Sequence, residues 1–455
     1  MTIDIDALRS RVAGRVVVPS DADYDEIKTV FVDPRESRPA AIVRVQDAKD
    51  AASVVTFAAE TGAELAIRSG GHSGAGHSTV DGGIVIDLRD MKGIDIDVGS
   101  RTAWAEAGLT AGEYTSTAHE HGLATGFGDT GSVGLGGITT GGGIGYLTRK
   151  HGMTIDSLLA AEIVTADGEI RIVDEDHEPD LFWAIRGGGG NLGVVTRFRF
   201  ALQEVGEVYG GMLVLPATPE VIVGFMEAAA AAPEELSGIA NVMSAPPMPF
   251  LPEDVHGTPI VMALMAYAGD VAEGERVLAT FRALATPLAD MVAAIPYPQM
   301  YPPEDPDYRP VAAAWTGFMD HVGIDDARTM LERIEASDAS MRVVQLRALG
   351  GAMARVPADA TAFAHRDRKI MINVAAFIDE PSQRPEREAW VLDLAGRLRQ
   401  GAPAAYVNFL GEDGPERIRE AYPSGTRERL ARIKATYDPT NLFRRNQNVA
   451  PAATT

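Results

Sequence analysis

The segment RSGGHSGAGHS, residues 68–78, places two histidines, His72 and His77, among glycines, serines and one alanine. Glycine loses more backbone entropy on ordering than any other residue, so a helix or a strand interior is disfavoured here. A glycine loop instead lets the backbone approach another group closely. The sequence therefore predicts a loop at which a histidine meets a bound group, and the rest of the chain must indicate which group that is.

Two further glycine clusters accompany this loop. The three clusters span residues 70–76, 131–145 and 187–193, all in the N-terminal half of the chain. Backbone N–H groups that no bulky side chain covers form concave sites for anions. Three such segments in one half of a chain predict that they converge on one large ligand that carries phosphate.

A dinucleotide site of the Rossmann type is one way to bind such a ligand. The stretch GGGNLG, residues 188–193, has the G-x-G-x-x-G spacing. Its context does not fit, because VVTRFRF (194–200) predicts a strand where that motif needs a helix. The cluster at 131–145 lacks the spacing, and no G-x-x-x-x-G-K-[ST] segment occurs. We therefore expect a different scaffold for the cofactor.

Composition narrows the remaining classes of protein. The 455 residues have a formal net charge of −23, which argues against nucleic acid and anionic membranes as partners, because phosphate groups bind basic surfaces. The absence of cysteine excludes disulfides, thiolate catalysis and iron–sulfur clusters. His119, Glu120 and His121 predict no metal site, because helix residues two apart do not share a face. With no visible secretion signal or membrane-spanning stretch, we expect a cytoplasmic protein.

Strand and helix patterns surround the glycine clusters. Strands are predicted over residues 41–45, 64–70 and 83–88. A helix is predicted over 47–62, between the first two strands, with Asp47 as its N-cap and Gly62 at its C-cap. This order predicts a parallel β-α-β unit. Residues 158–176 predict a β-hairpin around an Asp-Gly turn.

The sequence changes character near residue 205. Glycine clusters stop, and helix-like segments at 220–236 and 272–284 alternate with apolar strands such as 341–349 and 369–377. The proline-rich stretch 297–310 predicts a loop. We therefore expect a domain boundary near residue 205.

Four motifs, taken in order, resemble a known family. They are RSGGHS (68–73), GSVGLGGITTGGGIGYLTRKHGMTIDSL (131–158), LFWAIRGGGGNLGVVTRF (181–198) and YDPTNLFRRNQNVAP (437–451). Together they are similar to the berberine-bridge-enzyme-like FAD-linked oxidases, which have the FAD-binding fold of the vanillyl-alcohol-oxidase (PCMH) type. Within that family they resemble most the bacterial 6-hydroxy-D-nicotine oxidase branch.

The resemblance implies an α+β protein with two domains. Residues 1–205 would form the FAD-binding domain, to which residues 406–455 return. Residues 206–405 would form a substrate-binding domain built on an antiparallel sheet covered by helices.

The resemblance also gives the histidine loop a role. In the family, the histidine of the G-G-H loop carries the 8α-methyl group of the flavin, and that position is His72 here. His77 has no role in the family pattern. Many relatives attach the flavin a second time through a cysteine at the position of Thr130, so this chain can make only a single covalent attachment. The lack of a second attachment favours a smaller or more enclosed substrate.

Further flavin contacts follow from the motifs. Val133 matches a residue near C4a of the flavin, where a small valine admits oxygen and favours an oxidase. The resemblance implies that the cofactor-binding residues are Arg68, Ser69, Gly70, Gly71, His72, Ser73, Thr130, Gly131, Ser132, Gly134, Gly136, Gly137, Gly193, Val195, Asn446 and Asn448.

The substrate side is predicted from strand alternation and from the same resemblance. Asn373 lies near the position of a glutamate base in the plant enzymes, and an amide cannot act as that base. Gln345 and Arg347 share one strand face and could touch substrate. Tyr406 matches a Y-x-N segment that borders the active site, and a tyrosine can move a proton there if its pKa is depressed. His365 and Arg366 match a segment whose expected role is structural.

These observations predict an FAD-dependent oxidase. It would take a hydride from a C–H bond next to nitrogen or oxygen of a small molecule and pass the electrons to O2, which gives H2O2. A flavin dehydrogenase or an oxidative cyclase on the same fold is the alternative, and a non-catalytic ligand-binding protein is a more distant one. We expect no metal, and the sequence does not indicate the oligomeric state.

Overall fold

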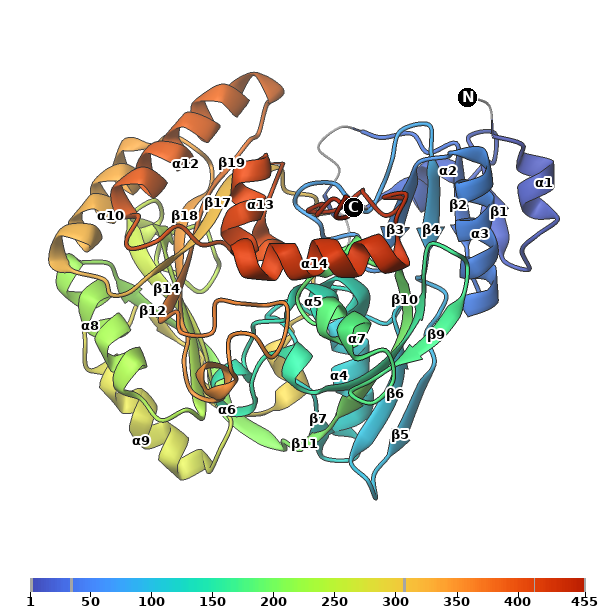
Figure 1. The fold of residues 1–455 in the computed structure, drawn as a ribbon. Helices are drawn as coiled ribbons and strands as arrows, with labels where there is room; N and C mark the ends of the chain where they lie inside the picture. The colour runs from blue at the N-terminus through green and yellow to red at the C-terminus, as the bar shows by residue number, and fades with distance from the viewer. Residues whose placement is uncertain (1–2, 33–35, 306–307, 413, 454–455) are drawn as a thin grey trace.

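The computed structural model describes residues 3–32, 36–305, 308–412 and 414–453. Its sheets and helices form two lobes, with the N-terminal strands in one lobe and a larger antiparallel sheet in the other (Figure 1). Part of the predicted proline-rich loop, at residues 306–307, lies outside the described residues.

The first lobe begins with a four-stranded sheet. In spatial order its strands are β1 (Arg15–Val17), β2 (Ala41–Arg44), β4 (Ile84–Asp87) and β3 (Leu65–Arg68). Strands β2 and β3 both pair with β4 in parallel, and helix α3 (Ala48–Thr61) connects them, so the predicted β-α-β unit is confirmed. Helix α3 begins where the Asp47 side chain accepts two backbone N–H groups and ends at Gly62, which has a φ of 71°.

A five-stranded antiparallel sheet completes the strand layers of this lobe. Its order is β5 (Ile94–Asp97), β6 (Thr102–Glu106), β10 (Val194–Ala201), β8 (Leu158–Val164) and β9 (Ile170–Val173). Strands β8 and β9 form the predicted hairpin. Strand β10 directly follows the third glycine cluster. The predicted strand at residues 194–200 is therefore confirmed, and a Rossmann motif would need a helix at this place. Helix α3 packs between the two sheets, against β4 on one side and β8 on the other.

The glycine-rich region 131–145 contains helix α5 (Leu135–Gly141), which the sequence did not predict. Three of its seven residues are glycine, and each glycine costs a helix about 1 kcal/mol relative to alanine. Tertiary packing overrides this cost, because Leu135 and Thr139 are fully buried. Close backbone contacts, described below, hold the helix in place.

The second lobe is built on an eight-stranded antiparallel sheet. Its order is β15 (Ala289–Asp290), β12 (Glu207–Pro216), β14 (Pro259–Tyr267), β13 (Leu236–Ser244), β18 (Arg342–Ala348), β19 (Ile370–Phe377) and β17 (Ala312–Met319), with β16 (Ala293–Pro296) paired to β12. Its outer face is covered by α8 (Pro219–Ala231), α9 (Val271–Arg282), α10 (Ile324–Ala336) and α12 (Arg384–Leu398), seen at the left of Figure 1. The predicted antiparallel sheet covered by helices is present.

Shorter elements connect these layers. The remaining helices and strands are α1 (Ile5–Arg9), α2 (Tyr24–Lys28), α4 (Ala111–His119), β7 (Leu123–Ala124), α6 (Thr148–His151), α7 (Pro179–Ile185), β11 (Gln203–Glu204) and α11 (Ala352–Arg355). The 3-10 turns are η1 (Thr154–Asp156), η2 (Gly189–Asn191), η3 (Glu253–Val255), η4 (Tyr297–Met300), η5 (Pro381–Gln383) and η6 (Val407–Phe409). The N-terminus of α4 has a capping box, in which Thr110 and Glu113 each bond the other's backbone N–H.

The C-terminal helices return to the first lobe. Helix α13 (Pro415–Ala421) leads into α14 (Ser424–Tyr437), which lies across α7 (Figure 1). Leu430, Phe443 and Val449 are part of the hydrophobic core of the first lobe. Buried apolar side chains between Tyr209 and Leu398 form a second core around the eight-stranded sheet. From this division we propose that residues 1–205 with 406–455 form one domain and residues 206–405 another.

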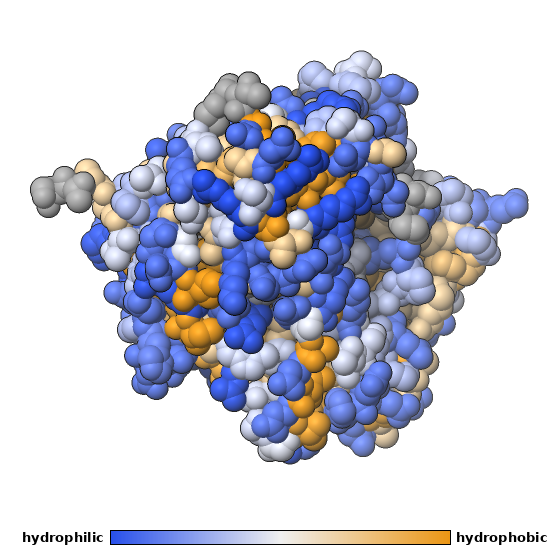
Figure 2. All heavy atoms as spheres, turned by 90° about the vertical axis from the view of Figure 1, so that its right-hand side faces the viewer, coloured by the Kyte–Doolittle hydropathy of each residue, from blue (hydrophilic) through white to orange (hydrophobic). Residues whose placement is uncertain are grey.

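Most of the face shown in Figure 2 is hydrophilic, with separate apolar patches. Large apolar side chains that are exposed among the described residues are Val98, Leu159, Ile170, Ile172, Phe250, Met291, Tyr308, Ile324 and Leu392. Within that part of the chain, no helix combines the length and the apolar character that crossing a membrane requires.

Candidate active site

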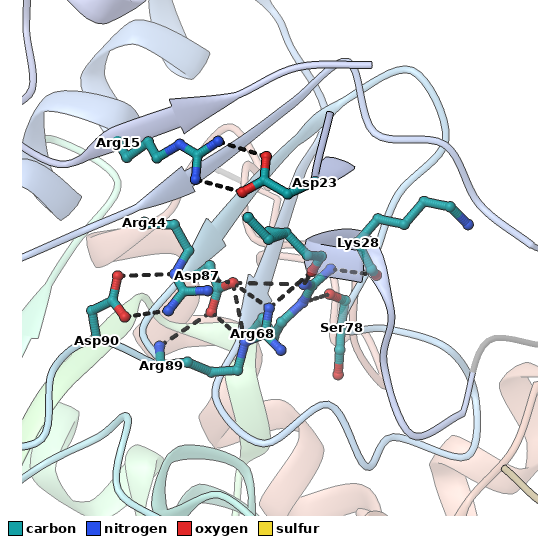
Figure 3. A network of polar contacts seen from close by, with 10 residues as sticks. Arg15, Asp23, Lys28, Arg44, Arg68, Ser78, Asp87, Arg89 and Asp90 are labelled. Carbon is teal, nitrogen blue, oxygen red and sulfur yellow. Dashed lines mark hydrogen bonds and ion pairs between the residues drawn. The ribbon is translucent and has the colours of Figure 1, made fainter. Parts of the chain in front are cut away.

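The histidine loop leaves strand β3 at Arg68, and a buried polar network anchors this point (Figure 3). The Arg68 guanidinium is fully buried, donates to the carbonyls of Ile27, Lys28 and Ser78, and lies 3.6 Å from Asp87. Arg68 does not line the cavity described below, and its role as a cofactor contact stays a prediction. Its side chain fixes the loop because a buried charge must keep its partners.

The first two glycine clusters meet at Gly70 and Gly134. A Cβ atom on Gly70 would lie 2.2 Å from the backbone N of Gly134, and a Cβ on Gly134 would lie 2.1 Å from the N of Gly70. Only glycine fits at both positions. Ser69 locks the contact, because its hydroxyl donates to the Ala107 carbonyl and accepts the N–H of Gly136 on helix α5. The histidine loop is thereby held at the N-terminal end of α5.

The third glycine cluster joins the same helix from another side. The N–H of Gly187 donates to the carbonyl of Thr140 at 2.9 Å, and turn η2 packs on α5. Asn446, from the C-terminal segment, donates to the carbonyl of Gly190 at 2.9 Å, while its buried Oδ1 has no partner within the described residues. The predicted convergence of the three glycine clusters is therefore present, with α5 at its centre.

A buried ion pair ties the C-terminal segment to this cluster. Lys434 and Asp438 are both fully buried and lie 3.1 Å apart. Nζ of Lys434 also donates to the carbonyl of Asn191 and, at 3.4 Å, to Oδ1 of Asn448. Burial lowers the pKa of Lys434, which the carboxylate of Asp438 opposes.

His72 lines a cavity of about 500 Å³ beside these loops. Its ring stacks on Phe31, with ring centroids 4.2 Å apart and planes 13° from parallel. Nε2 of His72 lies 3.0 Å from Oγ of Ser132, and Ser132 also bonds Glu304 through its hydroxyl and its backbone N–H. Burial lowers the pKa of His72, while the carboxylate of Glu304 raises it. His72 is thus held in a fixed orientation at the cavity wall.

Tyr406 lies at the other end of helix α5. Its buried hydroxyl accepts the N–H of Gly143 at 2.9 Å and the side-chain amide of Asn408 at 3.0 Å. Gly142 and Gly143 have φ values of 135° and 79°, which turn this N–H toward the phenol and which suit glycine. Burial raises the pKa of Tyr406, and the two hydrogen bonds offset only part of this effect. The sequence predicts that Tyr406 can move a proton if its pKa is depressed, and the pKa is instead raised.

Polar side chains of the eight-stranded sheet reach Phe409, whose ring packs against Tyr406. Arg347 is buried, donates to Gln345 at 2.9 Å and to Asp129 at 2.7 Å, and lies over the ring of Phe409. Gln345 and Asn373 are cross-strand neighbours. The buried Oδ1 of Asn373 has no hydrogen-bond partner in the described part of the chain. This face therefore offers an unused acceptor beside a paired arginine.

The other predicted residues surround these groups. Ser73, Thr130, Gly131 and Val133 are half-buried, and Gly131 lines the cavity with Ser132. Gly137 is exposed, and a Cβ there would meet nothing within 4 Å. Gly71 has a φ of 78°, which suits glycine.

Two of the predicted positions pack in the sheet next to the third cluster. A Cβ on Gly193 would lie 2.3 Å from the carbonyl of Val164. Val195 is buried in β10.

His365 and Arg366 make structural contacts. Nε2 of His365 bonds the carbonyl of Glu420 at 2.8 Å, and Arg366 forms two hydrogen bonds, of 2.7 and 2.8 Å, with Asp156. Burial lowers the pKa of His365 to about 4. These contacts join the segment after α11 to the first lobe.

Sequence reasoning missed two residues at the cavity. Phe31 stacks directly on His72, and Glu304 reaches His72 through Ser132. Neither residue belongs to one of the motifs. Phe31 precedes His72 by 41 positions, and Glu304 lies in the proline-rich segment 172 positions after Ser132. No spacing signal in the sequence could have connected them.

Family comparisons agree with this geometry. A family model described as "FAD binding domain" matches residues 39–174, and one described as "Berberine and berberine like" matches residues 405–450. The first match contains the histidine loop and α5, and the second contains Tyr406 and Asn446. Fold and site together define an FAD-linked oxidoreductase of the PCMH type.

Individual relatives place the chain more closely. It is 30% identical over 461 residues to (R)-6-hydroxynicotine oxidase of Paenarthrobacter nicotinovorans, covering 97% of each chain. It is 31% identical to an uncharacterized FAD-linked oxidoreductase of Bacillus subtilis, covering 97% of this chain and 98% of the relative. The crystal structure of 6-hydroxy-D-nicotine oxidase from Arthrobacter nicotinovorans matches with a TM-score of 0.87 at 26% identity. The match covers 97% of this chain and 98% of that chain. The chain belongs to the berberine-bridge-enzyme-like family of FAD-linked oxidoreductases.

Proposed function

We propose that this oxidoreductase is an oxidase that carries FAD covalently on His72. It takes a hydride from a C–H bond next to nitrogen or oxygen of a small molecule, with O2 as the acceptor and H2O2 as the product. The observation that carries the proposal is the position of His72, which is stacked, hydrogen-bonded and exposed to a cavity of about 500 Å³ beside the converging glycine loops.

The residues present fit FAD. Backbone segments without side chains line the cavity at Gly70 and Gly131, which suits close approach by a large ligand. The unpartnered Oδ1 of Asn446 beside Gly190 is an acceptor that a ligand can use. We propose that the loops at 69–73 and 131–137, together with Asn446 and Asn448, hold the cofactor.

Bound FAD supplies the chemistry that side chains lack, because it accepts the hydride and passes the electrons to O2. His72 contributes a nucleophilic nitrogen, since burial keeps its imidazole neutral at pH 7. A single attachment is proposed because Thr130 replaces the second attachment point. Val133, a small residue in the loop before α5, is proposed to leave oxygen a path.

Tyr406 and Asn373 are proposed to orient the substrate. Both acceptor sites of the Tyr406 hydroxyl are occupied by Gly143 and Asn408, so its own proton is the group it can offer. Asn373 offers an acceptor oxygen. Gln345 and Arg347, which bond to each other, are proposed to supply further polar groups for the substrate.

These groups favour an amine as the substrate. Oxidation of an alcohol needs a base for the hydroxyl proton, whereas the lone pair of a neutral amine assists hydride departure without one. The raised pKa of Tyr406 keeps it protonated at pH 7, Asn373 is an amide, and Asp129 is paired with Arg347. The similarity to a 6-hydroxynicotine oxidase supports the same choice.

An anaerobic half-reaction tests this function. The yellow protein is mixed without oxygen with a panel of secondary and tertiary amines and of primary alcohols, and flavin absorbance is followed. We expect at least one amine to bleach the flavin, and admitted O2 to restore the colour with one equivalent of H2O2. Bleaching that only an artificial acceptor reverses would assign a dehydrogenase. Bleaching by alcohols alone would contradict the preference for amines.

A further inference from the structure

His72 is the end of a chain of three polar side chains. Its Nε2 atom is 3.0 Å from Oγ of Ser132, and the Ser132 hydroxyl donates to Oε2 of Glu304. The backbone N–H of Ser132 donates to the other carboxylate oxygen at 3.1 Å. Glu304 lies in the proline-rich segment of the other lobe, so these bonds connect the histidine loop, the glycine-rich segment and the segment that covers the cavity.

The directions of these bonds select a tautomer of His72. A carboxylate only accepts hydrogen bonds, and a serine hydroxyl has one proton to donate. Because Ser132 gives that proton to Glu304, its oxygen must accept from Nε2–H of His72. A neutral imidazole carries one proton, so Nδ1 is the nitrogen with the free lone pair.

We propose that Ser132 and Glu304 are positioning residues for flavin attachment: they hold His72 as the Nε2–H tautomer and make Nδ1 the nucleophile. This inference rests on the proposed covalent attachment. Phe31 supports it independently, because ring stacking restricts rotation of the imidazole while the hydrogen bond fixes which edge faces Ser132. The lowered pKa of His72 agrees with a neutral ring.

The proton path gives Glu304 its effect on the attachment. When Nδ1 forms a bond to the 8α carbon, positive charge develops on the imidazole. Nε2–H can pass its proton to Ser132, whose own proton moves to the Glu304 carboxylate, and this transfer removes the positive charge from the imidazole. Overall, one C–H bond of the methyl group and one N–H bond of His72 are replaced by one C–N bond. The two electrons and two protons released reduce one O2 to H2O2.

The rate of attachment tests the inference. Full-length protein produced in riboflavin-depleted cells is mixed with FAD in air, and covalent flavin is measured in acid-precipitated protein over time. We expect Glu304→Gln to slow attachment about 100-fold, the lower range for loss of an acid–base partner. Because Glu304 also lines the cavity, the attachment rate is measured at saturating FAD, and the slowing should persist there. Glu304→Asp should recover part of the rate.

A matched control separates this role from a general effect of charge. Glu253 is an exposed carboxylate of the same lobe that does not line the cavity, so Glu253→Gln removes the same charge away from His72. We expect Glu253→Gln to attach FAD at the wild-type rate. Equal slowing in both variants would overturn the proposal.

Two spectroscopic readouts test the tautomer itself. In the full chain labelled with 15N-histidine, NMR shifts should identify His72 as the Nε2–H tautomer, and Ser132→Ala should remove this preference. The flavin peptide released from the holoenzyme should be linked through Nδ1. Linkage through Nε2, or unchanged attachment in Glu304→Gln, would overturn the inference and leave the proposed function intact. A wild-type pellet without flavin would overturn both.

Discussion

At the scale of single residues, the phenol of Tyr406 is the group from which we expect the largest effect on turnover. It is buried and receives hydrogen bonds from Gly143 and Asn408, so its own proton remains available to donate. Its raised pKa makes it a hydrogen-bond donor at neutral pH and not a base.

Tyr406→Phe removes that donor while it keeps the ring. We expect the rate of flavin bleaching by substrate to fall about 100-fold, as is typical when an acid–base group is lost. The flavin content should stay at the wild-type value. Tyr24→Phe is the matched control, because this phenol is equally buried, donates to the Pro39 carbonyl and does not line the cavity. A wild-type bleaching rate in Tyr406→Phe would remove Tyr406 from the mechanism.

His365 makes the stability of the fold depend on pH. Burial lowers its pKa to about 4 in the folded protein, while the ordinary value is 6.5. Between these values the unfolded chain binds the proton first, so stability falls as the pH drops from 6.5 to 4. The loss is on the order of 3 kcal/mol.

Urea unfolding at several pH values between 4 and 7 measures this effect. We expect His365→Gln to show a shallower loss of stability with acid, because its amide does not titrate. Some slope should remain, since burial also lowers the pKa of His151 to about 4. Identical slopes in the variant and the wild type would show that His365 is not the titrating group.

At the scale of elements, helix α5 depends on close backbone contacts that only glycine permits. A Cβ on Gly134 would overlap Gly70 and the Ser69 hydroxyl, at 2.1 and 2.2 Å. Gly134→Ala should therefore lower the free energy of unfolding by about 3 kcal/mol, the upper range for overpacking.

Gly137→Ala on the same helix is the comparison for this prediction. Apart from its own helix backbone and chain neighbours, no described residue has an atom within 4 Å of a Cβ there, so the variant should gain about 0.5–1 kcal/mol from better helix propensity. Denaturant titration of both variants measures the difference. If the two proved equally stable, the contact between the glycine clusters would not hold α5.

At the scale of the whole molecule, one buried ion pair connects distant parts of the chain. Arg366 is 2% exposed and forms two hydrogen bonds with Asp156, which lies 210 positions earlier. Arg366→Met leaves the Asp156 carboxylate without this partner, and such losses cost about 3–5 kcal/mol.

The exposed pair Arg355–Glu234 provides the control. Both side chains are open to solvent, and exposed pairs contribute about 0–1 kcal/mol, so Arg355→Met should cost no more than that. Urea unfolding followed by tryptophan fluorescence compares the two variants. A loss below about 1 kcal/mol for Arg366→Met would contradict its role in holding the lobes.

Local patterns predicted much of this architecture. The β-α-β unit follows from apolar runs with Asp47 and Gly62 at the helix ends, and the hairpin at β8 and β9 follows from an Asp-Gly turn. Helix α5 could not be predicted, because its glycines oppose a helix and only packing of Gly134 on Gly70 permits one.

The motifs predicted some of the residues that line the cavity but not all of them. His72 and Ser132 lie in glycine-rich motifs, so their types and spacing were informative. Arg68 belongs to the same motif, yet its side chain enters a buried network that no spacing indicates. Phe31 and Glu304 reach His72 from segments far away in sequence, and such contacts arise only from the folded chain.

The most direct test of the central claim is the fate of the flavin colour after acid precipitation. The account predicts that wild-type protein and His77→Ala keep the yellow colour in the pellet, and that His72→Ala loses it. Colour released into the supernatant from the wild-type protein would contradict covalent attachment at His72.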